Sequence, residues 1–197
     1  MQRQPGASIK PILVYAPLVD SGVINAATGI PDDPSYLDDT HPDVLWPTNS
    51  DHAYHGYSSV RTALKRSYNV YAVTLYKKDV TTCLTYLKNL GIDRMNETQP
   101  SAALGGLSTG VSTREMAAAY VPFGNGGRYY EPITYTKLYD KDGNVIIDKS
   151  EEKGTQVYNQ ETTSTVMTSL LNSVVTSGTG GSAQVRAASE ELIPTAG

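Results

Sequence analysis

The chain has very little cysteine, no excess of positive charge and no long apolar run. Each of these three absences excludes a class of protein. Its single cysteine, Cys83, cannot form an internal disulfide, so a disulfide-stapled scaffold is excluded. The formal net charge is −4 and the lysines and arginines are scattered, which gives no indication of nucleic-acid binding. No apolar stretch approaches the ~20 residues that a membrane-spanning helix needs.

The composition that remains is that of a globular protein. The 197 residues are 39% hydrophobic and 18% charged, which suits about one domain. Met1 stands directly before a Gln-Arg-Gln-Pro-Gly run, and we therefore expect the chain to be a piece of a longer protein.

The first dozen residues carry the first chemical motif. Residues 3–11 read Arg-Gln-Pro-Gly-Ala-Ser-Ile-Lys-Pro, and an apolar run follows at residues 12–16. This pattern predicts a loop that enters a helix over residues 7–18, with Ser21–Gly22 ending it. Positions three apart share one face of a helix, so residues 7 and 10 lie together.

That spacing is typical of serine acyltransferases of the S-x-x-K type, which place a nucleophile at the first position and a lysine base at the fourth. The lysine is present as Lys10, but the nucleophile position holds Ala7. Ser8 is a poor substitute, because one helical position turns its side chain by about 100° from the face of Lys10.

A second motif, S-x-N, stands at Ser67-Tyr68-Asn69. Ser58–Ser59 predict the start of a helix that runs from Val60 to about Arg66, and a further apolar run begins at residue 70. Two interpretations of the motif remain open. It contributes a hydroxyl and an amide to an active site, or Ser and Asn simply cap the next helix.

Residues 23–57 are rich in Pro, Gly, Asp and Asn and are predicted to be a loop. The three histidines of the chain fall in it, so its side chains are either metal ligands or solvated loop residues. The spacing of these side chains matches no known metal site, and we favour the second interpretation. The candidates are Asp43, Asp51, His52 and His55; the third histidine is His41.

The second half of the chain predicts more helix than strand. An amphipathic helix over 81–90 stops at Gly91, and a capping box of Ser112 and Glu115 starts another. Strands over 129–139 and 145–147, joined through an Asp-Gly pair, predict a β-hairpin. Asn159 is predicted to cap a last helix that ends near Val175. The fold class is therefore α+β, predominantly helical, with one short hairpin.

Three stretches together resemble the transpeptidase domain of class A penicillin-binding proteins. They are residues 3–11, residues 62–69 (Thr-Ala-Leu-x-x-Ser-x-Asn) and residues 100–127, which match the family's wording almost letter for letter. The family continues after Ala-Gly with a K-[ST]-G motif, and this chain ends at Ala196-Gly197. The resemblance implies that residues 1–197 are a partial transpeptidase domain of the β-lactamase-like fold.

The resemblance also implies a function and a set of roles. The family cross-links peptidoglycan stem peptides by acyl transfer from D-Ala-D-Ala through a serine acyl-enzyme, and β-lactam antibiotics imitate that substrate. It needs no cofactor or metal and works at the extracytoplasmic face of the bacterial membrane, to which the parent protein is anchored. Carried over, Lys10 is the base, Ser67 the proton relay, Asn69 the substrate-binding amide, and Ala7 occupies the nucleophile position.

Two hypotheses follow for this chain, which we expect to be inactive as it stands because a methyl group cannot attack a carbonyl. It is a truncated and substituted piece of a D,D-transpeptidase, or a natural pseudoenzyme that binds stem peptides or a partner. Either way, the resemblance predicts that Lys10 and Ser67 converge within hydrogen-bond reach, about 2.6–3.2 Å. It also predicts a cleft with Ala7 at its floor and Lys10 partly desolvated.

Overall fold

The computed structural model describes residues 1–34, 42–186 and 192–193. Helices dominate, and the described strands pair only in twos, which confirms the predicted helix-rich α+β class. The helical segments, with η for 3-10 or π-helix, are η1 (Gly6–Ile9), η2 (Pro11–Tyr15), α1 (Ala16–Asp20), α2 (Val60–Arg66), α3 (Asn69–Lys78), α4 (Val80–Asn89), η3 (Pro100–Leu104), α5 (Thr113–Gly124), α6 (Thr163–Ser177) and η4 (Gly181–Ala183). The described strands are β1 (Gly29–Asp32), β2 (Gly56–Ser59), β3 (Arg128–Tyr129), β4 (Lys137–Tyr139), β5 (Val145–Asp148), β6 (Thr155–Gln156), β7 (Val185–Arg186) and β8 (Leu192–Ile193).

The N-terminal helix runs from Gly6 to Asp20 in three consecutive segments, as predicted for residues 7–18. Its hydrogen bonding changes from 3-10 in η1 to π in η2 and to α in α1. The change coincides with Pro11, which has no N–H to donate, and the Pro11 carbonyl accepts from the N–H of Ala16, five residues on. Ser21 caps the end of the helix.

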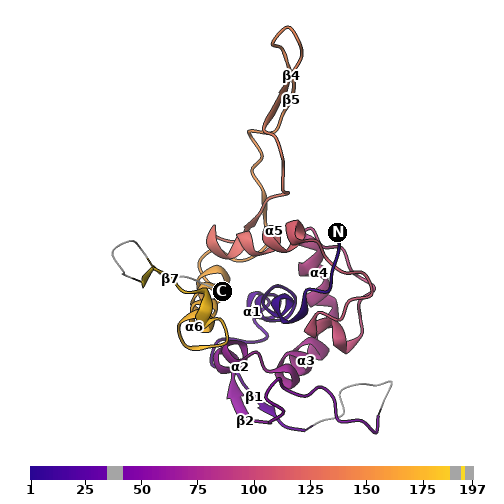
Figure 1. Cartoon of the computed structure of the whole chain (residues 1–197), viewed down its shortest axis with the longest axis vertical. Coiled ribbons are helices and arrows are strands. Elements are labelled where there is room, and N and C mark those ends of the chain that lie inside the picture. Colours follow the sequence, from indigo (N-terminus) through magenta and orange to yellow (C-terminus); the bar gives the residue numbers. More distant parts are fainter. Residues whose placement is uncertain (35–41, 187–191, 194–197) are drawn as a thin grey trace.

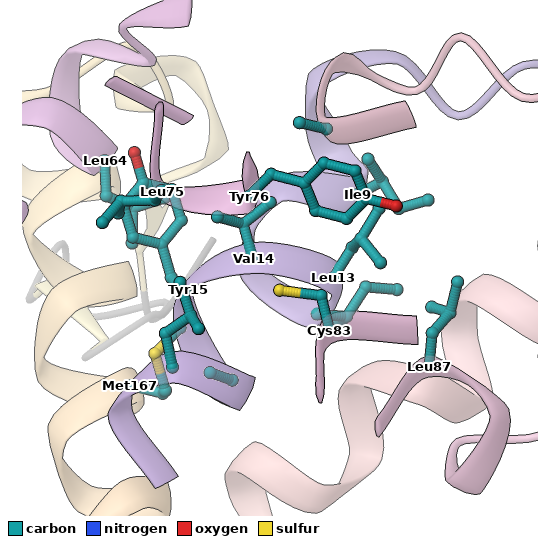
Figure 2. Packing of buried hydrophobic residues seen from close by; sticks show 14 of the residues in the cluster. Ile9, Leu13, Val14, Tyr15, Leu64, Leu75, Tyr76, Cys83, Leu87 and Met167 are labelled. Carbon is teal, nitrogen blue, oxygen red and sulfur yellow. The ribbon is translucent and has the colours of Figure 1, made fainter. Parts of the chain in front are cut away.

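This helix is the centre of the molecule. Figure 1 shows it end-on, with α2, α3, α4, α5 and α6 arranged around it. Residues 12–16 are all 0% exposed, which is expected of a helix that is apolar on every side and enclosed by protein. Figure 2 shows side chains from the surrounding helices gathered against it, among them Leu64, Leu75, Tyr76, Cys83, Leu87 and Met167.

The prediction that residues 23–57 are entirely loop was wrong at both ends. Strand β1 pairs antiparallel with β2, in a register that sets Gly29 opposite Ser59 and Asp32 opposite Gly56. Neither strand shows alternating hydrophobicity, and β1 contains Gly29 and Pro31, residue types that are depleted in strands. Their pairing depends on contacts across the intervening loop, which a local pattern does not reveal.

The predicted strand over 129–139 was also wrong in its middle. Only its two ends are strand: β3 pairs with β6, and β4 pairs with β5. The β4–β5 hairpin with its Asp142–Gly143 turn is confirmed, and it extends away from the helices in Figure 1. Gly143 has a φ of +86°, the left-handed conformation that such a turn requires.

The last long helix begins later than predicted. Asn159 does not cap α6, which starts at Thr163. Its side-chain oxygen accepts from the N–H groups of Glu161 and Thr162, and so closes the turn before the helix. In the part of the chain that the structure describes, no helix is both long and apolar enough to cross a membrane.

Candidate active site

The Lys10 side chain is buried and held by a single turn of the chain. Its residue is 1% exposed, and Nζ donates to the Ser67 carbonyl at 2.7 Å and to Asn69 Oδ1 at 2.7 Å. Ser67 Oγ lies 3.0 Å from Nζ, and the Tyr68 carbonyl lies 3.4 Å away. The predicted convergence of the Lys10 and Ser67 side chains is therefore confirmed. It joins the first and second motifs in one site.

The backbone at Ser67 explains why these acceptors face the same way. Ser67 ends α2 in the left-handed conformation (φ 58°, ψ 40°), which is uncommon for a residue other than glycine. This reversal turns the chain before α3 begins at Asn69. The alternative interpretation, in which the Ser67 and Asn69 side chains merely cap the next helix, is wrong. The N-cap of α3 is Tyr68, which makes no side-chain cap bond, and both motif side chains are within hydrogen-bond distance of Lys10 Nζ.

The electrostatics of the site bring Lys10 close to the range of a general base. Burial lowers the pKa of its ammonium from 10.5 to about 8, because the charged form loses its hydration. Hydrogen bonds to the turn favour the charged form and work in the opposite direction. A lysine with a pKa near 8 can accept a proton at a physiological pH, whereas an ordinary lysine stays protonated.

A cleft of about 210 Å³ opens beside Lys10. Ala7, Ser8 and Ser67 line it with Lys10. The other lining residues are Pro11, Leu64, Tyr120, Leu171, Val174 and Thr179. We expected Ala7 at the floor of the cleft. This expectation was wrong, because Ala7 lines the cleft but is exposed. The Ser8 hydroxyl donates to the Pro5 carbonyl at 2.7 Å, and this bond commits it to the preceding loop.

The stretch over residues 100–111 holds the entrance of the central helix. Gln4 and Leu107 exchange two hydrogen bonds, and Arg3 pairs with Val111 as a β-bridge. Gly105 packs against Gly6 so closely that an added Cβ would lie 2.4 Å from its backbone nitrogen. The Gly-rich signature in this stretch is thus needed to seat the S-x-x-K helix start.

Two residues of the site were missed by the sequence interpretation. Asn49 and Thr48 lie in the loop between β1 and β2, and both are hydrogen-bonded to Asn69. No periodicity, charge pattern or motif marks them, and a lone Asn in a loop is ordinarily a turn residue. Only the folded arrangement brings them to the motif.

The histidine-rich loop does not form a metal centre in the described part of the chain. His55 Nε2 lies 2.9 Å from Asp51 Oδ2, and the His55 ring stacks on Tyr68 with centroids 4.4 Å apart. Outside residues 35–41, 187–191 and 194–197, no three His, Cys, Asp or Glu side chains could together hold a metal ion. Asp43 and His52 are exposed, and His41 lies outside the described residues.

Larger hollows lie away from this chemistry. One of about 550 Å³ runs between α5 and α6, and its lining is mostly Ser, Thr, Gly and amide side chains. Another of about 510 Å³ lies near Arg114, Glu115 and Glu131. The smaller cleft beside Lys10 is lined by the amine of Lys10 and the hydroxyl of Ser67, whose Oγ lies 3.0 Å from Nζ.

The chain is similar in sequence to known proteins over most of its length. The family model for the penicillin-binding protein transpeptidase domain matches residues 1–196. Penicillin-binding protein 1A of Clostridium botulinum is 37% identical over 190 residues, which cover 90% of this chain and 22% of that protein. The chain thus spans less than a quarter of the length of this relative.

Solved structures share the fold at lower identity. Penicillin-binding protein 1A from Haemophilus influenzae aligns with a TM-score of 0.77 at 22% identity, covering 92% of this chain and 32% of that one. The PonA1 protein from Mycobacterium tuberculosis in complex with penicillin V aligns with a TM-score of 0.68 at 20% identity, covering 88% and 46%. At these identities the likeness shows the fold alone.

Proposed function

Because the chain belongs to the penicillin-binding protein transpeptidase family, we propose that it is part of an enzyme that cross-links peptidoglycan by acyl transfer from D-Ala-D-Ala stem peptides. The observation that carries the proposal is the contact of Lys10 Nζ with Ser67 Oγ and Asn69 Oδ1 beside position 7. In this proposal residues 1–197 are one partial catalytic domain. β-Lactams are its inhibitors, which the penicillin V complex of a structural relative supports.

The roles follow from the chemistry of each group. In a relative with serine at position 7, that hydroxyl passes its proton to the neutral Lys10 amine, and its oxygen attacks the carbonyl between the two D-alanines. The neutral amine is available because burial lowers the pKa of Lys10 to about 8. As the carbon–nitrogen bond breaks, the Ser67 hydroxyl relays a proton to the departing D-alanine. The Asn69 amide orients the substrate backbone. A second stem peptide's amine then displaces the serine oxygen and forms the cross-link.

The chain as it stands lacks the first of these groups. The Ala7 methyl has no lone pair with which to attack, and the Ser8 hydroxyl is bonded to the Pro5 carbonyl. We therefore propose that this chain forms no acyl-enzyme. The second candidate, a natural pseudoenzyme that binds stem peptides, is favoured by one observation: Lys10 Nζ is hydrogen-bonded to Ser67 Oγ and Asn69 Oδ1 although position 7 holds no nucleophile.

The location follows from the substrate. Peptidoglycan lies outside the cytoplasmic membrane, so the proposed activity places the domain at the extracytoplasmic face, in a parent protein that is anchored to the membrane. The relative in Clostridium botulinum is more than four times as long as the matched segment, which leaves room for an anchor there.

The experiment restores the nucleophile. In the natural full-length protein, A7S is expected to release D-alanine from a peptide ending in D-Ala-D-Ala, and A7S/K10M is expected to release none. No release by A7S would overturn the proposal. Calorimetric titration of the unaltered protein with the same peptide tests the second candidate, which requires binding without release of D-alanine. A serine codon at position 7 in the natural gene would rule out the pseudoenzyme candidate.

A further inference from the structure

We propose that Asn49 is a positioning residue that ties the Ser67–Asn69 turn to a buried carboxylate, Asp32. Its importance for catalysis rests on the proposed function, but the physical link between these residues does not. The inference concerns the loop over residues 42–55, which contains Asn49 and packs beside the S-x-N turn.

Asn49 makes the contacts of a connector. It is 3% exposed, and its Oδ1 accepts from the backbone N–H of Asn69 at 2.7 Å. Its Nδ2 donates to Asp32 Oδ2 at 2.7 Å and to the Ala53 carbonyl at 2.9 Å. One acceptor and two donors are thus used at once, and an amide offers that combination where a carboxylate or a methyl group does not.

The neighbouring residue fixes the other end of Asn69. The Thr48 carbonyl accepts from Asn69 Nδ2 at 2.7 Å, so the Oδ1 of that amide turns toward Lys10 Nζ, 2.7 Å away. The Asn69 N–H itself belongs to the first turn of α3, where backbone donors have no partner within the helix. Thr48 and Asn49 therefore hold both the backbone and the side chain of Asn69.

Asp32 anchors the connector. It lies at the end of β1, is fully buried, and its Oδ2 also accepts from the backbone N–H of His55 at 3.1 Å. Its Oδ1 has no hydrogen-bond partner within the described ranges. A buried carboxylate that lacks one partner is costly, and a fold retains such a group where it stabilises something else.

We infer that Asp32 stabilises the Lys10 ammonium through intervening hydrogen bonds. A continuous series of hydrogen bonds joins Lys10 to Asp32 through the Tyr68–Asn69 peptide and the Asn49 amide. Lys10 Nζ donates to the Tyr68 carbonyl at 3.4 Å, the Asn69 N–H donates to Asn49 Oδ1, and Asn49 Nδ2 donates to Asp32 Oδ2. Hydrogen bonds in such a series polarise one another in the same sense. The nearby phenols of Tyr15, Tyr68 and Tyr120 are neutral near pH 8, because burial raises the pKa of each.

The first test measures position. Amide hydrogen exchange at Asn69 is followed by NMR in the unaltered protein and in N49A. Loss of the acceptor is expected to speed exchange at Asn69 at least about tenfold beyond the average change in α3. The control is N25A, since the Asn25 side chain also accepts a backbone N–H in a loop, at 2.9 Å, but away from the site. Equal exchange at Asn69 in both variants would overturn the proposal.

The second test measures charge, through the pKa of Lys10 Nζ with ¹³C-labelled lysine. D32N is expected to lower that pKa, by about half a unit. D33N removes the same charge at the adjacent exposed residue and is expected to leave it unchanged. A double variant, D32N/N49D, moves the carboxylate one link closer to Lys10 and is expected to raise the pKa above its original value. Equal values in D32N and D33N would show that Asp32 is only structural.

The third test joins the inference to the chemistry. In full-length A7S protein, N49A is expected to slow acylation by penicillin about tenfold while reversible binding changes little. An unchanged acylation rate would overturn the positioning role. If A7S is not acylated at all, the proposed function fails, and the exchange and pKa measurements still decide whether Asn49 and Asp32 hold the turn.

Discussion

Lys10 Nζ lies 3.0 Å from Ser67 Oγ, although 57 residues separate the two in the chain. The contact joins the buried central helix to the turn between α2 and α3. Among the described residues, the amine's hydrogen-bond acceptors all belong to residues 67–69. Such a contact has a structural and a chemical consequence: it locks the turn in place, and it puts a hydroxyl where it can exchange a proton with the amine.

Removal of the amine should destabilise the fold. K10M leaves the Ser67 carbonyl and Asn69 Oδ1 without their donor, and a buried unsatisfied acceptor costs about 1–3 kcal/mol. Methionine carries no charge, so the cost of burying an ammonium disappears and offsets part of this penalty. The free energy of unfolding in a urea titration is therefore expected to fall by about 2 kcal/mol. The control is K88M, because Lys88 pairs with Asp93 at 2.9 Å on the surface and should contribute less than about 1 kcal/mol. Equal losses would contradict a buried, fully bonded Lys10.

Stability should also depend on pH through this lysine. The folded pKa of about 8 lies below the ordinary 10.5, so between these values the unfolded chain holds a proton that the folded chain has lost. The free energy of unfolding contributed by Lys10 therefore rises with pH across this window, by up to about 1.4 kcal/mol per pH unit. Below pH 8 both states are protonated and the destabilisation is complete. The difference between the unaltered protein and K10M, measured from pH 7 to 9.5, isolates the effect. Parallel curves would show that the pKa of Lys10 is not lowered.

The left-handed backbone at Ser67 predicts that glycine is more stable than alanine at this position. S67A keeps a Cβ in this conformation and loses the hydroxyl, whereas S67G loses the hydroxyl and relieves the strain. S67G should therefore be more stable than S67A by about 1 kcal/mol in thermal or urea unfolding. Neither should support acylation in an A7S background, because both lack the relay. S67A as stable as S67G would mean that the turn is not strained.

Two glycines form a matched pair for the entrance of the central helix. Gly105 and Gly143 have nearly the same φ, +84° and +86°, so alanine costs each the same backbone strain, about 1 kcal/mol. A Cβ on Gly105 would also meet the backbone of Gly6 at 2.4 Å, whereas one on Gly143 meets open space. G105A should lose clearly more stability than G143A, by roughly 2 kcal/mol. Similar losses would show that residues 100–111 do not seat the helix start.

The parts of the site that were predicted from sequence carry a local signal. Lys10 and the Ser67–Asn69 turn stand in short motifs with fixed spacing, and the family resemblance requires them to meet. The N-terminal helix follows from the Pro-Gly turn and the apolar run after it, although its enclosure by the other helices was not predicted. The β4–β5 hairpin follows from its Asp-Gly turn.

The parts that were missed depend on contacts between distant residues. The β1–β2 pair consists of two short strands without alternation, so only its partner across the loop makes each of them a strand. Asn49 and Asp32 look like loop residues until the fold places one against Asn69 and the other against Asn49. The change from 3-10 to π-helix around Pro11 was not predicted, because a proline near a helix start indicates where the helix begins and not which hydrogen-bond pattern it adopts.

The central claim is that Lys10, Ser67 and Asn69 are placed for acyl transfer, and that the hydroxyl missing beside them is the one at position 7. Peptide mass mapping after exposure to penicillin tests it most directly, with the natural full-length protein unaltered and as A7S. The account predicts no adduct on the unaltered protein and a penicilloyl adduct at position 7 in A7S. An adduct on Ser8 in either protein, or none on A7S, would contradict it.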